Sequence, residues 1–203
     1  NDDTKVKSGF NSDLIRPVFS ILNPELTYTV SPYQTACGIV DILMHTLERY
    51  LNDASNQYFT DEIALGLMKS VLKCGKMALA NPYDYEARSN LMWSSTMALN
   101  KIVGLSKMQD WQVHSIEHQL GAYTDCAHGM GLAAISIPYY KHIYKYGVKK
   151  FARFAKVVWD IKEDNKTEEE VALEGVNALE VFIKNTGMVT SLKELGATKE
   201  MLP

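Results

Sequence analysis

The sequence predicts an all-α protein, a helical bundle that follows a short extended N-terminal segment. From residue 31 onward, apolar residues recur with the 3.6-residue period of amphipathic helices, and several of these stretches begin at a capping residue. No stretch after residue 31 alternates polar and apolar residues with the period of two that marks a half-buried strand, and the chain has no internal repeat. We therefore expect residues 31–203 to form the bundle.

Residues 1–30 combine extended-looking pieces with turn residues. The pieces PVFSIL and LTYTV favour strands, and Pro17, Asn23 and Pro24 interrupt them, so this segment predicts one or two short strands and a connector. The chain opens on a polar stretch without Met and stops at ATKEMLP, where Thr198 is typical of the N-cap of a further helix. We interpret the chain as a piece of a longer polypeptide.

Capping signals and helix breakers divide the bundle into eight helices. They are expected at about 31–50, 61–80, 84–102, 110–121, 126–146, 148–160 and 167–187, with a short helix after Thr190. Ser31 and Gln34 form a capping box with Pro32 at the favoured first position, which fixes the first start. Thr60 and Asp84 are the N-caps expected for the next two helices.

The later helices depend on similar signals. Asp110 is the expected cap of the fourth helix, which should break at Gly121. Pro138 should kink or break the fifth helix, because proline lacks the N–H that an interior position needs. Thr167 and Glu170 form a second capping box at the start of the seventh.

Composition and charge restrict the class of protein. A formal net charge of −3 and a pI near 6.0 argue against nucleic acid or an acidic membrane surface as the main partner. The longest apolar runs are shorter than the roughly 18–20 residues that a membrane helix needs. Three widely spaced cysteines, Cys37, Cys74 and Cys126, favour buried free thiols in a reducing compartment, by default the cytoplasm.

Two pairs of chemically active residues stand at helical spacing. Asp41 and His45 are four apart on the first helix, His114 and His118 are four apart on the fourth, and His128 starts the fifth. One carboxylate and several imidazoles could supply three or four ligands to a divalent cation such as Fe²⁺ or Zn²⁺, with a position left open for catalysis. Structural histidines are the alternative, and spacing alone does not separate His114 from His118.

Other positions carry two interpretations each. Glu48 could orient a ligand histidine or form an ion pair on the helix surface. Gly129 and Gly131 could admit a ligand near the backbone or meet a packing constraint. The same choice between pocket wall and core applies to Met92, Trp93 and Tyr123, and His142 fits a packing or surface residue.

Three segments together resemble a known family. Residues 23–50 (NPELTYTVSPYQTACGIVDILMHTLERY) and 114–133 (HSIEHQLGAYTDCAHGMGLA) are similar to the two signatures of the iron-containing, group III alcohol dehydrogenases. Residues 81–100 (NPYDYEARSNLMWSSTMALN) resemble the stretch between them in the butanol dehydrogenase-like branch. The likeness covers the chain after residue 10, although Asn23 stands where the family usually has an acidic residue.

The resemblance implies a fold and a division of roles. It implies a dehydroquinate synthase-like, C-terminal α domain that is truncated at its C-terminus, with residues 1–30 as a connector from a missing N-terminal α/β nucleotide-binding domain. That domain would bind most of the NADPH or NADH. The family pattern carries the role of metal ligand, for Fe²⁺ or Zn²⁺, onto Asp41, His45, His114 and His128. It makes His118 a candidate for proton relay, near the substrate and the nicotinamide.

The implied function is an NAD(P)H-dependent alcohol dehydrogenase that interconverts small primary alcohols and aldehydes, and we expect the 203-residue chain alone to be inactive. One alternative is a helical metal-dependent hydrolase or lyase with His118 as base, and another is a non-enzymatic interaction domain. We expect a homodimer or higher homo-oligomer, in which exposed edges of residues 1–30 could associate.

Overall fold

A computed structural model of the chain describes residues 3–10, 12–52 and 57–201. Within these residues all regular structure is helical, which confirms the predicted all-α class. The α-helices are α1 (Pro32–Tyr50), α2 (Tyr58–Ala80), α3 (Tyr85–Leu99), α4 (Gln112–Thr124), α5 (His128–Ile143), α6 (Val148–Val158), α7 (Glu168–Asn185) and α8 (Leu192–Leu195).

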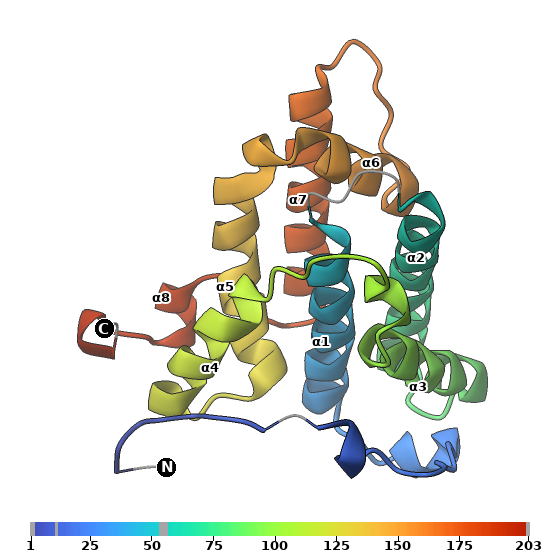
Figure 1. Ribbon diagram of the computed structural model, residues 1–203, viewed down its shortest axis with the longest axis vertical. Helices are drawn as coiled ribbons and strands as arrows, with labels where there is room; N and C mark the ends of the chain where they lie inside the picture. Colours follow the sequence, from blue (N-terminus) through green and yellow to red (C-terminus); the bar gives the residue numbers. More distant parts are fainter. Residues whose placement is uncertain (1–2, 11, 53–56, 202–203) are drawn as a thin grey trace.

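Helix α1 lies at the centre of the bundle. It packs against α2 and α3 on one side and against α5 and α4 on the other, and α6 and α7 pack against each other across one end (Figure 1). Because α1 has neighbours on several sides, apolar side chains around most of its circumference are fully buried; examples are Val40, Met44 and Leu47. The remaining face of α1 carries Asp41 and His45.

The predicted capping residues mostly act as expected. The Ser31 hydroxyl accepts a hydrogen bond from Gln34 N, at 3.2 Å, and the Asp84 carboxylate accepts one from Ala87 N, at 2.9 Å. The capping box of Thr167 and Glu170 is complete in both directions. These side chains satisfy donors that the first turn of a helix leaves open, so helix starts could be predicted from local sequence.

Three predicted boundaries are wrong. Helix α2 starts at Tyr58, so Thr60 is buried in its first turn and is not its cap. Helix α4 starts two residues after Asp110, whose carboxylate accepts a hydrogen bond from the Tyr139 hydroxyl, at 2.8 Å. It also continues through Gly121 to Thr124, since a single glycine weakens a helix without ending it. Tertiary contacts decide these ends.

Helix α5 also differs from expectation. Pro138 lies inside it without breaking it, and the helix runs on to Ile143 before a single 3-10 turn, Tyr144–Tyr146. Among the described residues, no helix is both long and apolar enough to cross a membrane. Cys37 and Cys74 are buried and Cys126 is half-buried, and all are free thiols, as predicted.

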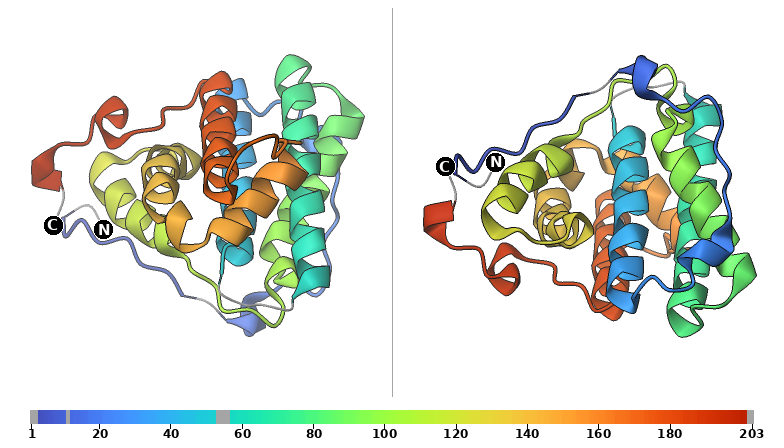
Figure 2. Two further views of the ribbon diagram at one scale, coloured as in Figure 1. Left: turned by 90° about the horizontal axis from the view of Figure 1, so that it is seen from above. Right: turned by 90° about the horizontal axis from the view of Figure 1, so that it is seen from below.

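The N-terminal segment forms no strand within residues 3–10 and 12–30, so the predicted strands are wrong there. Residues 1–2 and 11, which belong to the same predicted segment, lie outside the described part. Instead the segment makes two 3-10 turns, Asp13–Ile15 and Pro24–Thr27, and runs along one end of the bundle (Figure 2, right). A strand needs a partner strand, and the described chain offers none. Many apolar side chains of the segment are exposed, including Phe10, Leu14, Val18, Phe19 and Ile21.

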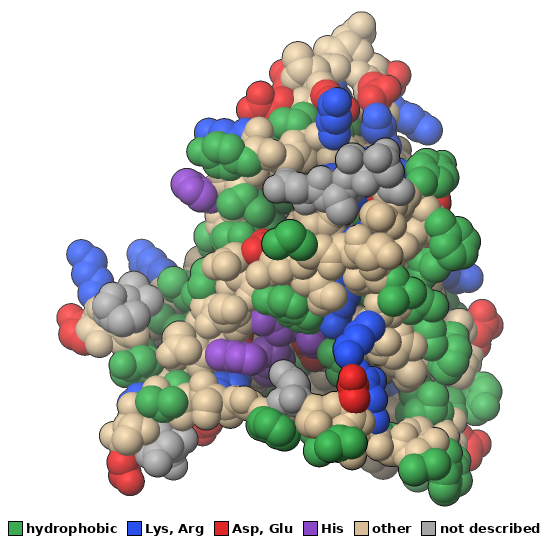
Figure 3. Space-filling view, in the orientation of Figure 1, with side chains coloured by type: hydrophobic (Ala, Val, Ile, Leu, Met, Phe, Trp, Pro, Cys, Tyr) green, Lys and Arg blue, Asp and Glu red, His purple; other side chains and the backbone are tan. Residues whose placement is uncertain are grey.

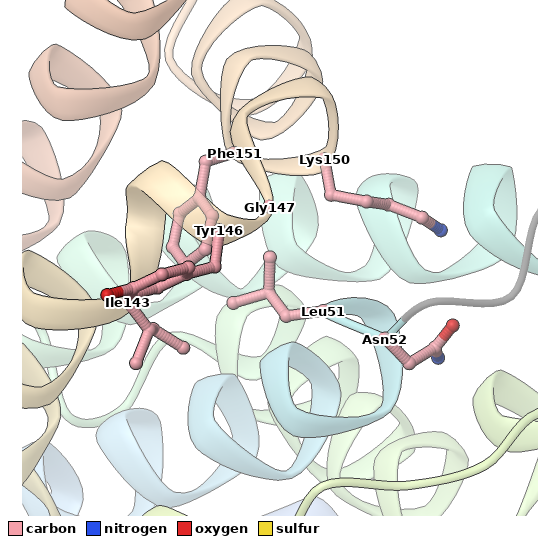
Figure 4. Close-up of a pocket in the computed structure, with 7 residues that line it drawn as sticks. All are labelled: Leu51, Asn52, Ile143, Tyr146, Gly147, Lys150 and Phe151. Atoms are coloured by element: carbon pink, nitrogen blue, oxygen red, sulfur yellow. The ribbon is translucent and has the colours of Figure 1, made fainter.

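A cavity and an ion cluster lie where α1 ends. The cavity, of about 130 Å³, is lined by Leu51, Asn52, Ile143, Tyr146, Gly147, Lys150 and Phe151 (Figure 4). The Lys150 side chain extends away from the apolar residues of this cavity and pairs with Asp61, at the start of α2. Since His45 and Asp41 lie roughly one and a half and two and a half turns before the end of α1 at Tyr50, this cavity is separate from the histidine cluster.

Candidate metal centre

Helix α1 supplies two of the candidate ligands. Asp41 and His45 are one turn apart on the same face, and His45 Nε2 lies 3.4 Å from Asp41 Oδ1. Both side chains are partly buried, with 35% and 17% of the side-chain surface exposed. A carboxylate in such a place needs a partner, so this face of α1 is built for polar contacts.

Helix α4 brings His114 to the same place. Residue 114 lies in the first turn of α4, and its side chain is only 7% exposed. The preceding segment holds Trp111 in the left-handed backbone region, at φ 61°, and the Trp111 ring packs edge-on against the His114 and His45 rings, with centroids 5.2 and 5.5 Å apart. Non-glycine residues adopt this φ only at a cost, which the packing of the indole offsets.

Helix α5 brings His128 through a close approach of two backbones. His128 is the first residue of α5, and Gly129 follows it against α1. A Cβ atom on Gly129 would lie 2.2 Å from the carbonyl oxygen of Cys37, so only glycine permits this contact. Because Cys37 is one turn before Asp41, the contact sets His128 beside that carboxylate.

The three imidazoles converge on one oxygen atom. Nε2 of His45, His114 and His128 lies 3.4, 3.7 and 3.7 Å from Asp41 Oδ1, respectively. In a tetrahedral site with bonds of about 2.0–2.1 Å, neighbouring ligand atoms are roughly 3.3–3.5 Å apart. Figure 3 shows histidine side chains gathered in a hollow of this face. Ligand atoms of Asp41, His114 and His128 lie within 4.8 Å of one another, which suits one divalent ion, and His45 Nε2 faces the same carboxylate oxygen.

Two of these atoms also lack any other partner. Asp41 Oδ1 and His114 Nε2 are buried, and neither has a hydrogen-bond partner among the residues that the structure describes. Buried polar atoms in folded proteins are nearly always paired, and an ion would satisfy both of these. The donor set, one carboxylate and three imidazoles, suits Fe²⁺ or Zn²⁺. The residues present thus fit the metal that the sequence predicts.

Buried carboxylates hold two of the imidazoles from behind. Glu48 Oε2 contacts His114 Nδ1, and Glu117 Oε2 contacts His128 Nδ1. Glu48 and Glu117 are 1% and 0% exposed, so each carboxylate depends on these contacts. A carboxylate that accepts the Nδ1 proton leaves the Nε2 lone pair free for a metal and fixes the ring orientation. Of the two interpretations of Glu48, the structure therefore shows the orienting contact.

The electrostatics of the cluster favour an ionised Asp41. Burial raises the pKa of Asp41, but the surrounding imidazoles lower it by more, and its net pKa lies below the usual value. Burial lowers the pKa of His45 to about 4 against the opposing pull of Asp41, so this imidazole is neutral. Burial also acts downward on the pKa of His114, but Asp41 and Glu48 outweigh it and raise that pKa to about 9.

We expect the metal affinity of the chain to fall as pH falls below about 9. In the metal-free protein His114 carries an extra proton below its pKa of about 9, and an ion must displace that proton from Nε2. The affinity for Zn²⁺ should therefore drop about tenfold per pH unit between pH 8 and 7. Calorimetry in two buffers should show the release of about one proton per ion. An affinity that is constant over this range would contradict the assignment of His114.

Substitution of the two buried glutamates should separate metal affinity from stability. We expect Glu117→Gln and Glu48→Gln each to weaken Zn²⁺ binding about 10–100-fold, because an amide orients the imidazole less well. Glu48 Oε1 also accepts from Val113 N, at 2.6 Å, and an amide cannot accept both bonds. Glu117 Oε2 also pairs with Lys7 Nζ, at 3.4 Å, but the Lys7 side chain is 41% exposed, so water can replace that partner. Glu48→Gln should therefore lower the free energy of unfolding by more than Glu117→Gln does, by about 1–3 kcal/mol. Chelator competition and urea unfolding measure the two effects, and equal losses of stability would contradict this division.

His118 lies at the edge of the cluster. It is exposed, and its ring centroid is 5.5 Å from that of His128 and 6.5 Å from that of His114. Burial and the nearby Lys7 ammonium lower the pKa of His118 from its usual value. Glu117, His118 and His128 form a second group within 4.8 Å, but it holds only two imidazoles, and Glu117 Oε2 already contacts one of them at Nδ1. We therefore favour the group around Asp41 as the ion site.

The other candidate residues lie outside the cluster. His142 is exposed at the far end of α5, as the interpretation of a packing or surface residue allows. Met92 lines a groove of about 210 Å³ between α1 and α3, and Trp93 and Tyr123 are exposed. Gly131 is closely packed, because its Cβ would lie 2.8 Å from Glu117 Cγ.

Two residues beside the cluster, Glu117 and Arg49, are not among the site residues that the sequence predicts. Glu117 is one turn after Val113 and one turn before Leu120, and both of these are buried. An acidic residue on such an apolar helix face indicates a buried carboxylate with a partner. No pattern in the sequence assigns Arg49 a role beside the histidines. Arg49 is 4% exposed, and its guanidinium lies over the Trp111 ring, 4.3 Å from the centroid. No local pattern predicts that contact.

Comparison with known proteins gives consistent matches. Residues 35–203 match the family model described as "Fe-containing alcohol dehydrogenase family, C-terminal". The chain is 37% identical over its whole length to NADH-dependent butanol dehydrogenase A of Clostridium acetobutylicum, and 32% identical over 97% of its length to the NADPH-dependent aldehyde reductase YqhD of Escherichia coli. It covers 52% and 50% of these relatives, so it spans about half their length.

Solved structures agree with this match. The crystal structure of NADH-dependent butanol dehydrogenase A from Thermotoga maritima superimposes on 98% of the chain with a TM-score of 0.92 and 36% sequence identity. The superposition covers 50% of that relative. The helical arrangement described above is therefore shared with a protein of known structure over nearly all of this chain.

Proposed function

Because the chain belongs to the Fe-containing alcohol dehydrogenase family, we propose that it forms the metal- and substrate-binding part of a nicotinamide-dependent alcohol dehydrogenase. The reaction would interconvert small primary alcohols and aldehydes, as the names of the relatives suggest. The observation that carries the proposal is the convergence of three imidazole Nε2 atoms on Asp41 Oδ1. Helix packing alone gives no reason for three imidazoles to face one buried carboxylate oxygen.

The division of labour within the enzyme is part of the proposal. Residues 31–203 would bind the metal and the substrate oxygen, and residues 1–30 would connect to a nucleotide-binding region that holds most of NADH or NADPH. The match to only half of each relative's length supports this division. Assembly into a homodimer or higher homo-oligomer and a cytoplasmic location stay predictions from the sequence.

Each group in the centre would have a distinct task. Asp41, His45, His114 and His128 would hold Fe²⁺ or Zn²⁺. When bound, the ion supplies polarisation of the substrate oxygen, and the nicotinamide supplies or accepts the hydride. Glu48 and Glu117 orient two of the imidazoles from behind.

His118 would move the proton of the alcohol oxygen. It is exposed beside the cluster and has a lowered pKa, so its neutral form can accept a proton at neutral pH and pass it to solvent. It has no role in holding the ion in this assignment. Spacing in the sequence does not distinguish these different roles of His118 and His114.

The location of the ion is the direct test. We expect crystals grown with Fe²⁺ or Zn²⁺ to show anomalous scattering between Asp41, His45, His114 and His128. An ion between Glu117, His118 and His128 would overturn the ligand assignment. In the parent enzyme, Asp41→Asn should abolish NAD(P)H-dependent reduction of butyraldehyde, and the 203-residue chain alone should show none.

Two other classes of function would give different results. A metal-dependent hydrolase or lyase predicts turnover by the metal-loaded chain without nicotinamide, for example hydrolysis of a phosphoester. A non-enzymatic interaction domain predicts no stoichiometric metal at all. Neither alternative is favoured by the comparisons, since the relatives named above are dehydrogenases and a reductase.

A further inference from the structure

The three imidazoles of the candidate metal centre are not equivalent, because different groups face their Nδ1 atoms. His114 and His128 each face a buried carboxylate, from Glu48 and Glu117. His45 Nδ1 instead lies 3.3 Å from Arg49 Nη1, one turn along α1. One of the three candidate imidazole ligands therefore contacts a cation, and the other two contact carboxylates.

The chemistry of arginine fixes the direction of the hydrogen bond. A guanidinium has five N–H donors, no acceptor, and stays protonated in proteins. Arg49 Nη1 must therefore donate, and His45 Nδ1 must accept. A neutral imidazole that accepts at Nδ1 carries its proton on Nε2, which is the atom that faces Asp41 Oδ1 at 3.4 Å. Nε2 then has no lone pair for a metal.

Arg49 is anchored in this position. The same Nη1 also donates to the His45 carbonyl oxygen, at 2.8 Å, and the guanidinium stacks over the Trp111 ring. The side chain is 4% exposed, so it is packed among neighbours in this position. To bind an ion at Nε2, His45 must move its Nε2 proton to Nδ1 and break the bond from Arg49, or release that proton to solvent and become an imidazolate. His114 also releases an Nε2 proton when it binds, but its bond to Glu48 survives, as does the bond of His128 to Glu117. Of the three imidazoles, only His45 therefore loses a hydrogen bond or becomes an anion.

We propose that Arg49 is a positioning residue that makes His45 the weakest and most readily exchanged ligand of the metal centre. This inference rests on the proposed metal site. It implies that His45 dissociates from the ion first, while Asp41, His114 and His128 retain it. It also implies that Arg49 lowers the metal affinity of the chain, although it touches no ion.

The test compares substitutions at residue 49 with ligand removal, using Zn²⁺ and a competing chelator on the full 203-residue chain. Arg49→Gln removes the cation and offers an amide oxygen to His45 Nδ1–H, and we expect it to tighten binding about tenfold. Arg49→Met removes the donor without offering an acceptor, and it should give a smaller gain. His45→Ala should weaken binding less than His114→Ala does.

A double substitution separates the imidazole from general electrostatics. If the tighter binding came only from the loss of a nearby positive charge, it would persist in a variant that lacks His45. We expect Arg49→Gln to give no gain in the His45→Ala background, because the gain acts through the imidazole. A gain that persists there, or no gain from Arg49→Gln in the native background, would overturn the inference.

A spectroscopic measurement tests the same point without a substitution. In the metal-free chain, ¹⁵N NMR of labelled histidine should show His45 with its proton on Nε2, and a proton on Nδ1 would overturn the inference. Circular dichroism of each variant checks that it is folded. If the native chain binds no Zn²⁺, the proposed metal centre itself fails and this inference with it. If it binds Zn²⁺ and the variants at residue 49 do not differ, only this inference fails.

Discussion

Replacement of Gly129 by alanine is expected to remove most of the metal affinity of the chain. The new Cβ would lie 2.2 Å from the Cys37 carbonyl oxygen and 2.6 Å from the Cys37 Cα, and both of these Cys37 atoms belong to the backbone of α1. No side-chain rotation relieves such a contact, so α5 must move away from α1. His128, the adjacent residue, moves with it and leaves the position beside Asp41.

The expected size of this effect follows from the small displacement that a metal ligand tolerates. Binding groups work only when held within roughly 0.5 Å of their productive positions. We therefore expect the Zn²⁺ affinity of Gly129→Ala to fall about 100-fold or more. Overpacking of this kind should also lower the free energy of unfolding by about 1–3 kcal/mol. Chelator competition and urea unfolding measure the two quantities.

Gly38→Ala is the matched control. Gly38 follows Cys37 on the same helix, but a Cβ there would meet no atom within 4 Å. Alanine favours a helix over glycine by up to about 1 kcal/mol, so this variant should be as stable as the native chain or more stable. Its metal affinity should not change. If Gly129→Ala also bound Zn²⁺ with native affinity, the close approach of α1 and α5 would not position His128.

Much of the fold could be predicted because the signals are local. Side chains such as Ser31 and Asp84 cap the helix that follows them, and the periodic apolar residues of α1 face neighbours around the helix. Asp41 and His45 could be paired from spacing alone, since residues four apart share a helix face. The N-terminal strands failed because pairing depends on a second strand, which local composition does not reveal.

The candidate site could be predicted only in part, because its contacts join distant segments. The choice of His114 over His118 depends on which side of α4 meets α1, and the sequence contains no measure of that. Glu117 and Arg49 act through residues on other elements, with Glu117 held against α5 and Arg49 against the Trp111 ring. Such roles depend on helix packing, which spacing within one helix cannot predict.

A buried ion cluster next to α1 gives the second large expected effect. Asp61 is 3% exposed and lies between three cationic side chains. It pairs with Lys107, Lys150 and Arg153, and the Lys107 side chain is 0% exposed. Lys107 belongs to the segment between α3 and α4, so this pair anchors the residues that lead to Trp111 and His114.

We expect Asp61→Asn to lower the free energy of unfolding by about 3–5 kcal/mol, because it leaves the Lys107 ammonium buried without a counter-charge. Burial already lowers the pKa of Lys107, and Asp61 opposes that shift. Without Asp61 the pKa of Lys107 falls further. At a pH below that pKa, the folded state buries a charged ammonium that water solvates in the unfolded state, which destabilises the fold. Stability of the variant should therefore recover as pH rises, and urea unfolding at pH 7 and pH 9 measures this.

Glu62→Gln is the control for removing an acid from the same cluster. Glu62 pairs with Arg153, but its side chain is 44% exposed, and solvent can replace the lost partner. Its loss should change stability by about 1 kcal/mol or less. Asp61→Asn should in addition weaken Zn²⁺ binding, since Lys107 no longer fixes the segment before α4, while Glu62→Gln should not. Equal effects of the two substitutions on stability would mean that burial of Lys107 does not control this region, and native Zn²⁺ affinity in Asp61→Asn would mean that α4 holds His114 without it.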